Sequence, residues 1–416
     1  MTVHLNLDLT FFRRLNSDSM SIFTWLLTIQ FMEIKKIIPI FIGFLLIYTN
    51  LFAGSEKGKT AQYFFVGTYT GGGSEGIYSY SLNPVTGKLT DWGVAAKTEN
   101  PSFLAFSADK NFLLAVNETK DEHNHNMGYI GSFLINKNEH HLKLINRVPS
   151  GGADPCYVSV NQFNYVLAAN YTGGNVALFR LDESGRLSES VDIEQHYGHG
   201  PNKDRQMEPH VHSAFFEPLS DRVFVSDLGT DQVSVYLLDK ASSKLVNASA
   251  PSINIIPGSG PRHLAFHPAL KIVYVVNELS NDISVVTLNK DGSFRIIETV
   301  STLPAGNSKP SNCADIHISR DGRFLYASNR GFNSIAIFSV DSASGRIKLI
   351  GEEPTRGDFP RNFTLSPNED FLLVANQNSQ DIVSFRRDKQ SGKLRFADQV
   401  KAFKPVCLLF SGDGAK

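Results

Sequence analysis

A module of about fifty residues recurs along most of this chain, and no other feature limits the possible folds as strongly. Prolines that precede an apolar run stand at positions 101, 155, 209 and 261, at intervals of 54, 54 and 52 residues. Two further copies begin at Pro360 and Pro405, and Cys313 takes the place of the proline in a copy between Pro261 and Pro360. Each copy contains four short apolar stretches that indicate strands. A period near fifty with four strands per unit is typical of a β-propeller.

The number of blades follows from the turns between the third and fourth strands. These polar turns occur seven times, as NPVTGK, NKNEHH, DESGR, DKASSK, NKDGS, DSASGR and DKQSGK. Tyr63–Thr70 matches the second strand of the other copies, and the first strand that this copy lacks stands at Lys404–Phe410. We therefore predict an all-β, seven-bladed β-propeller with four antiparallel strands per blade over residues 55–416. The C-terminal strand is expected to pair into the N-terminal blade, which leaves no exposed sheet edge.

Residues 1–54 differ in kind and are predicted to form an upstream extension followed by a signal peptide. From Met32 the chain reads MEIKKIIPIFIGFLLIYTNLFAGS, with two lysines, an apolar run near Ile37–Tyr48, and small residues at Ala53 and Gly54. This is the layout of a secretory signal, so we expect export to the periplasm or the cell exterior, with cleavage near Ala53. A lone membrane anchor is the alternative, although the apolar run is shorter than the roughly twenty residues that a span needs.

Composition excludes several classes of function. The 40 basic and 41 acidic residues leave a formal net charge of −1, which gives no footprint of nucleic-acid or anionic-membrane binding. Cys156, Cys313 and Cys407 are an odd number, and each stands at the start of a predicted inner strand. We interpret them as small buried hydrophobic residues and not as disulfide partners or nucleophiles. A closed ring needs no partner for its stability, so we expect a monomer that has no stable membrane partner after signal cleavage.

The clearest copy of the module spans Gly258–Asp282, GSGPRHLAFHPALKIVYVVNELSND. Its two apolar runs flank a polar bend and predict an antiparallel pair of strands joined by a tight turn. In such a pair the start of one strand lies beside the end of the other, so Arg262 and Glu278 should share one rim of the sheet. The ordinary interpretation of such a pair is a structural ion pair, and the alternative is a catalytic centre.

These motifs as a set resemble a known family. GSGPRHLAFHP together with VVNE, SNRGFNSI at Ser328–Ile335 and GPNKDRQMEPHVH at Gly200–His212 is similar to the seven-bladed lactonase family, which includes propeller-type 6-phosphogluconolactonases and carboxymuconate cyclases. The resemblance covers nearly all of Ala61–Phe410. It implies lactone chemistry at one mouth of the central channel and requires neither a metal nor a cofactor.

The resemblance also assigns roles to residues of this chain. Glu278, Arg262 and Arg330 match the catalytic glutamate and the two arginines, and the catalytic histidine is His210 or His212, with His212 preferred. Glu278 would act as general base on a water molecule. The arginines would stabilise the oxyanion or bind an acidic group of the substrate, and the histidine would assist proton transfer to the leaving ring oxygen.

Other polar residues are expected at the same mouth. We predict substrate contacts from His210, Arg361, Arg205, Gln377 and Glu118, the last because it occupies the same place in its copy as Glu278. Further histidines, at positions 123, 125, 196 and 199, follow strands that end at this rim, and a metal site is the alternative interpretation of them. The insertion that contains His196 and His199 is expected to form a lid or wall.

Three functions remain open from the sequence. The first is hydrolysis of a sugar-acid lactone, with 6-phosphogluconolactone or a related aldonolactone as the small-molecule substrate. The second is a cycloisomerase of the carboxymuconate type, and the third is a propeller that binds a ligand without catalysis, because a propeller fold alone does not establish a function. Export argues against a phosphorylated substrate, since the family's phosphogluconolactonases act in the cytoplasm.

Overall fold

The structure is a computed structural model that describes residues 60–411 except 120–126, 137–138, 219 and 290–291. The predicted signal peptide and upstream extension lie outside these residues, as do His123 and His125. Between Thr60 and Ser411 the described chain contains strands and no helix, so none that could cross a membrane is present there.

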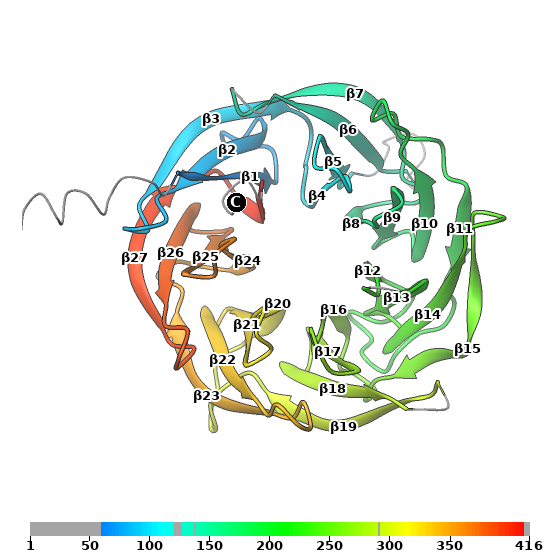
Figure 1. Ribbon diagram of the computed structural model, residues 1–416. Coiled ribbons are helices and arrows are strands. Elements are labelled where there is room, and N and C mark those ends of the chain that lie inside the picture. The colour runs from blue at the N-terminus through cyan, green and yellow to red at the C-terminus, as the bar shows by residue number, and fades with distance from the viewer. Residues whose placement is uncertain (1–59, 120–126, 137–138, 219, 290–291, 412–416) are drawn as a thin grey trace, which may run out of the picture. The chain divides into compact units, whose positions relative to one another are not determined.

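The predicted seven-bladed propeller is confirmed. Seven four-stranded antiparallel sheets are arranged around a central channel, with one strand of each sheet innermost (Figure 1). The N-terminal blade contains β1 (Gln62–Thr68), β2 (Gly76–Leu82) and β3 (Leu89–Lys97), and its innermost strand is β28 (Pro405–Phe410). Since β28 pairs antiparallel with β1, the ring is closed by the C-terminal strand as the sequence predicted.

The other six blades keep their strands in chain order from the inside outward. They are β4 (Leu104–Phe106), β5 (Phe112–Asn117), β6 (Tyr129–Asn136) and β7 (His141–Pro149); β8 (Pro155–Val160), β9 (Tyr165–Asn170), β10 (Asn175–Arg180) and β11 (Asp192–Gln195); β12 (Val211–Phe216), β13 (Arg222–Asp227), β14 (Gln232–Asp239) and β15 (Lys244–Asn254); β16 (Pro261–Phe266), β17 (Ile272–Asn277), β18 (Asp282–Leu288) and β19 (Phe294–Ser301); β20 (Asn312–Ile318), β21 (Phe324–Arg330), β22 (Ser334–Val340) and β23 (Ile347–Pro354); and β24 (Pro360–Leu365), β25 (Phe371–Asn376), β26 (Asp381–Arg387) and β27 (Leu394–Lys401).

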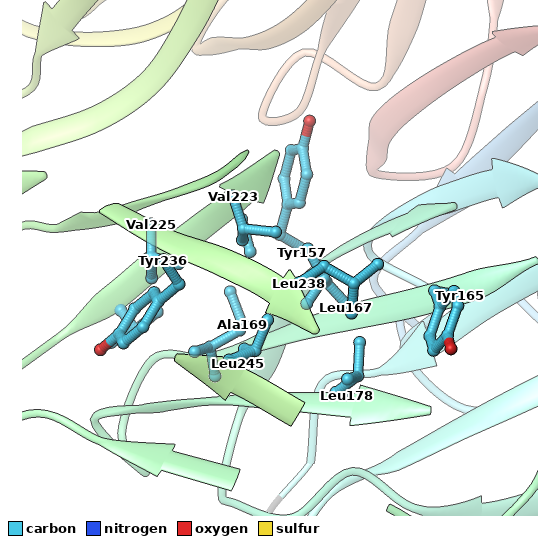
Figure 2. Packing of buried hydrophobic residues seen from close by; sticks show 13 residues of the cluster. Tyr157, Tyr165, Leu167, Ala169, Leu178, Val223, Val225, Tyr236, Leu238 and Leu245 are labelled. Carbon is cyan, nitrogen blue, oxygen red and sulfur yellow. The ribbon is translucent and has the colours of Figure 1, made fainter. Parts of the chain in front are cut away.

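The core is divided among the interfaces between neighbouring blades. Each of the seven interfaces has its own cluster of buried apolar side chains. In Figure 2, Leu167 and Leu178 from one blade pack with Val223, Val225 and Leu238 from the next. Because second strands are buried on both faces, they appear in the sequence as continuous apolar runs.

Turns and strand ends fix the register of the blades. Gly392, in the turn between β26 and β27, has a positive φ of 72°, and a Cβ atom there would overlap the ring of Phe324 in the neighbouring blade. The asparagines at the ends of second strands bond to backbone carbonyls: the side-chain amides of Asn170, Asn329 and Asn376 donate to the carbonyls of Ser150, Thr302 and Thr355. The three cysteines are buried and unpaired, which confirms their interpretation as core residues.

Candidate active site

The inner strands carry a repeated irregularity near one end of the channel. In β16, Pro261 lies opposite Asn277 while His263 lies opposite Val276, so Arg262 is an extra residue in a β-bulge. A bulge re-aims the side chain of its extra residue. The same shift occurs in β8, β12 and β24, where the extra residues are Cys156, His212 and Arg361. Of these side chains, Cys156, Arg262 and Arg361 line one small cavity. The bulges therefore point these side chains into the channel.

The bulges correct one detail of the sequence pattern. Pro209 was expected to open an inner strand, but β12 begins at Val211, which lies opposite Asp227 as Pro261 lies opposite Asn277. His212 is therefore the structural equivalent of Arg262. The strand start predicted from the proline spacing was wrong by two residues here, because Pro209 belongs to the insertion that precedes β12.

The centre of the site is the carboxylate of Glu278, one residue past the end of β17. Its Oε2 atom lies 3.0 Å from Nε of Arg262 and 2.7 Å from Nη2 of Arg330, and its Oε1 atom lies 2.7 Å from Nη2 of Arg205. Glu278, Arg262 and Arg330 are buried, whereas the Arg205 side chain is 37% exposed. The rim contact predicted between Arg262 and Glu278 is thus present, and two further arginines join it.

Backbone carbonyls of β20 hold the two buried guanidinium groups in place. Nη1 of Arg262 donates to the carbonyl of Ala314 at 2.5 Å, and Nη2 of Arg330 donates to the carbonyl of Cys313 at 2.7 Å. Nε of Arg330 is buried and has no hydrogen-bond partner among the described residues. One buried donor in the cluster therefore remains available to a bound molecule.

Burial and charge act in opposite directions on this cluster. Burial raises the pKa of Glu278, but the charges of Arg330, Arg262 and Arg205 outweigh it and hold the pKa well below its usual range. Burial, together with Arg330 and Arg361, lowers the pKa of Arg262 to about 10. At neutral pH Glu278 is an anion and Arg262 is a cation, so the ion pair is intact.

The two candidate histidines occupy different environments. His212 is buried, and burial, followed by the nearby charge of Arg262, lowers its pKa well below the usual value, so its imidazole is neutral at pH 7. His210 is partly buried and stacks on Tyr171, with ring centroids 4.4 Å apart. Tyr171 also meets His212 edge to face at 5.6 Å and accepts a hydrogen bond from Arg205 at 3.3 Å. Tyr171 therefore links both histidines to the arginine cluster.

A second acidic group lies across the channel from this cluster. The hydroxyl of Tyr69 donates to the carboxylate of Glu118, at 2.8 Å from Oε1 and 2.9 Å from Oε2. The guanidinium of Arg361 lies 5.3 Å from the centroid of the Tyr69 ring. A cavity of about 10 Å³ is lined by Glu118, Arg361 and Arg262, so Glu118 faces the same space as one arginine of the Glu278 cluster.

Sequence reasoning missed Tyr69 and Tyr171. Both directly follow a second strand, in the position that Glu118 and Glu278 occupy in their own blades. Reading that position in every copy would have found them. Gln377 stands in the same position, and its side-chain oxygen is buried without a hydrogen-bond partner among the described residues.

Of the other predicted rim histidines, the two that the structure describes, His196 and His199, do not join the cluster. Nδ1 of His196 lies 2.8 Å from Oδ2 of Asp227, and its Nε2 lies 3.2 Å from the Tyr236 hydroxyl, so it braces the insertion against β13 and β14. His199 is exposed. In the part of the chain that the structure describes, no three His, Cys, Asp or Glu side chains come together to hold a metal ion.

Comparison with known proteins agrees with the fold. The family model "Lactonase, 7-bladed beta-propeller" matches residues 63–410. A 6-phosphogluconolactonase of Bacillus subtilis is 38% identical over 349 residues, which are 83% of this chain and 97% of that protein. A 6-phosphogluconolactonase of Formosa agariphila is 38% identical over 336 residues, 80% of this chain and 94% of that protein.

The solved structures include an exported relative. The structure of a periplasmic gluconolactonase of Pseudomonas aeruginosa superposes with a TM-score of 0.79 at 34% sequence identity. The match covers 84% of this chain and 99% of that chain.

Proposed function

The chain belongs to the seven-bladed β-propeller lactonase family, and from that premise we propose that it hydrolyses a sugar-acid lactone at the Glu278 cluster. The observation that carries the proposal is the convergence of three arginines on one buried carboxylate at the mouth of the channel. Its similarity to two 6-phosphogluconolactonases and to a periplasmic gluconolactonase supports 6-phosphogluconolactone or a related aldonolactone as the substrate.

The charge of the site favours an acidic substrate. The two centres together contain four arginines and two glutamates: Arg205, Arg262 and Arg330 contact Glu278, and Arg361 lines the small cavity with Glu118. The surplus is positive, and guanidinium groups match carboxylate and phosphate oxygens in geometry. A substrate that brings an acidic group would balance this surplus.

In the proposed reaction, Glu278 accepts a proton from water as the water oxygen bonds to the lactone carbonyl carbon. Arg262 and Arg330 stabilise the oxyanion of the tetrahedral intermediate. The bond between the carbonyl carbon and the ring oxygen then breaks, and the ring oxygen leaves as a hydroxyl after it receives the proton. His212, which is neutral, hydrogen-bonds the leaving oxygen and assists this transfer.

Substrate charge would also adjust the base. Because three arginines hold its pKa low, Glu278 alone is a weak base. A phosphate or carboxylate bound to Arg205 or Arg361 would offset part of their charge and raise the pKa of Glu278. The proposal therefore predicts a larger kcat for an anionic lactone than for a neutral one.

The test follows acid release above the spontaneous rate with 6-phosphogluconolactone and δ-gluconolactone. We expect Glu278→Gln and Arg262→Ala to lower kcat by about 10²–10³. Arg346→Ala is the matched control, because Arg346 stands in the turn before β23, pairs with Glu298 of β19 away from the channel, and has a side chain that is 53% exposed. Absence of a rate above the spontaneous one on both lactones, or equal activity of all three variants, would overturn the assignment.

We further propose that the protein is exported, as its periplasmic structural relative is. The support from this chain is the secretory pattern that begins at Met32. Cell fractionation with N-terminal sequencing tests it. A mature N-terminus near Gly54 in the periplasm or medium is the expected result, and an intact chain in the cytoplasm is the opposing one.

A further inference from the structure

The channel has a second compartment at the end opposite the Glu278 cluster. Inner strands begin at the rim of the active site and run away from it, and their later residues line a cavity of about 550 Å³. Its wall contains residues from all seven inner strands, β4, β8, β12, β16, β20, β24 and β28. Figure 1 shows the inner strands arranged around the channel. Its volume lies within the roughly 300–1,000 Å³ that small-molecule sites occupy.

A polar partition separates this cavity from the active site. Nδ1 of His263 lies 2.8 Å from Oδ1 of Asp315, and Nε2 of His317 lies 3.1 Å from Oδ2 of the same residue. The side-chain amide of Asn362 donates to Oδ2 at 2.5 Å, and the backbone N–H groups of Ile316 and Phe363 donate to the two oxygens.

This partition is satisfied without a ligand. Five donors surround the Asp315 carboxylate, and one of them is His317, an ionisable group of the lining. The cavity lining that the structure describes contains no Lys, Arg or Glu. The polar end of the cavity therefore needs no charged partner. A charged ligand would lose its hydration here without finding a new counter-charge.

The walls are mainly apolar and include several aromatic rings. Tyr157 and Phe215 lie with ring centroids 4.8 Å apart, and Phe215 meets Phe266 edge to face at 6.5 Å. Phe103 and Leu409 also line the cavity. Phe103, Phe215, Phe266 and Leu409 remain partly exposed although they sit inside the ring. Such walls offer water few hydrogen bonds, and displacement of poorly held water by an apolar group favours binding.

From these contacts we propose that the cavity is a binding site for a small uncharged molecule with an aromatic or alicyclic ring. The ligand would enter from the face of the propeller opposite the lactone site. Its rings would pack against Phe103, Phe215 and Phe266 under the Asp315 partition. The cavity is distinct from the site proposed for hydrolysis, since none of the groups assigned to that reaction lines it.

The test uses the purified full chain and the neutral fluorescent probe N-phenyl-1-naphthylamine. Saturable fluorescence enhancement is expected with the wild type. Ala265 lines the cavity from β16, so Ala265→Trp should fill the space and weaken probe binding at least tenfold. Ala343→Trp is the matched control, because Ala343 is exposed in the turn between β22 and β23; it should bind the probe as the wild type does.

Measurements of lactone hydrolysis and of thermal unfolding distinguish loss of the cavity from loss of the active site or of the fold. Ala265→Trp should retain hydrolysis while it loses the probe, which separates the two sites. If it unfolds several degrees below the wild type, Ala105→Phe tests the same space from β4. The proposal is overturned if enhancement does not saturate, or if a folded cavity-filling variant binds the probe as tightly as Ala343→Trp.

Discussion

Replacing Glu278 with glutamine should destabilise the whole propeller as well as the reaction. Glu278 is the shared counter-ion of Arg262 and Arg330, whose side chains are 2% and 6% exposed. Glutamine keeps the shape and one acceptor but removes the charge. Both guanidinium groups would then stay buried beside each other without compensation, fixed by the carbonyls of Ala314 and Cys313.

Removing one partner of a buried ion pair typically costs about 3–5 kcal/mol. The contact with Arg205 adds little to this, since the Arg205 side chain is 37% exposed and the pair is screened by solvent. With an unfolding entropy of about 2.1 cal/mol/K per residue, a propeller of about 350 residues changes by roughly 0.75 kcal/mol for each degree of Tm. The expected fall in Tm for Glu278→Gln is therefore about 4–7 °C.

Thermal unfolding followed by circular dichroism at pH 7 provides the assay. Glu75→Gln is the control, because Glu75 pairs with Lys97 on the surface, where solvent screens the pair, and should leave the Tm nearly unchanged. The double variant Glu278→Gln/Arg262→Met should recover part of the loss, because it removes a charge from both sides. A Tm of Glu278→Gln within 1 °C of the wild type would refute this account of the cluster.

Three further predictions concern the pH dependence of stability, the closing strand and the Tyr69 hydroxyl. Thermal stability should fall as the pH drops below about 6.5. In that range His263 binds a proton in the unfolded chain, whereas in the folded protein burial lowers its pKa to about 4 and it stays neutral. The depressed pKa values of Glu278 and Asp315 extend the loss to lower pH, and a Tm at pH 5 equal to that at pH 7.5 would contradict this. Deletion of Pro405–Phe410 should unfold the ring cooperatively, seen as one early transition in calorimetry, because it opens the edge of β1; separate melting of the first blade alone would disagree. Tyr69→Phe should raise KM for an anionic lactone with little change in Tm, since it removes the donor that positions Glu118, and an unchanged KM would count against that positioning.

The fold was predictable because each copy of the repeat independently indicates the same four strands. Seven copies of one strand pattern, each with the same polar turn, leave little choice but a ring of equal blades. The displaced first strand at Lys404–Phe410 gave the closure. The exception shows the limit of this reasoning: at Pro209 the spacing alone placed the strand two residues early, and only the pairing of Val211 with Asp227 shows the correct position.

The site was predictable only in part, for a physical reason. The contact of Arg262 with Glu278 follows from antiparallel pairing, which relates residues within one blade. Arg205 comes from an irregular insertion 73 residues away in sequence from Glu278, and no repeat fixes where such a segment lies. The same holds for the stacking of Tyr171 on His210, which depends on the path of that insertion.

The bulges explain how a regular ring can hold an irregular site. In an unbroken strand, alternate side chains must face the neighbouring blades, where apolar packing decides their identity. An extra residue at the bulge does not take part in that alternation, so Cys156, His212, Arg262 and Arg361 can differ without changing the blade interfaces. The channel therefore carries charge at the level of the bulges while the same strands, a few residues later, form the apolar wall around Phe266. The repeated β-bulge thus accounts for both a charged compartment and an apolar compartment in one channel.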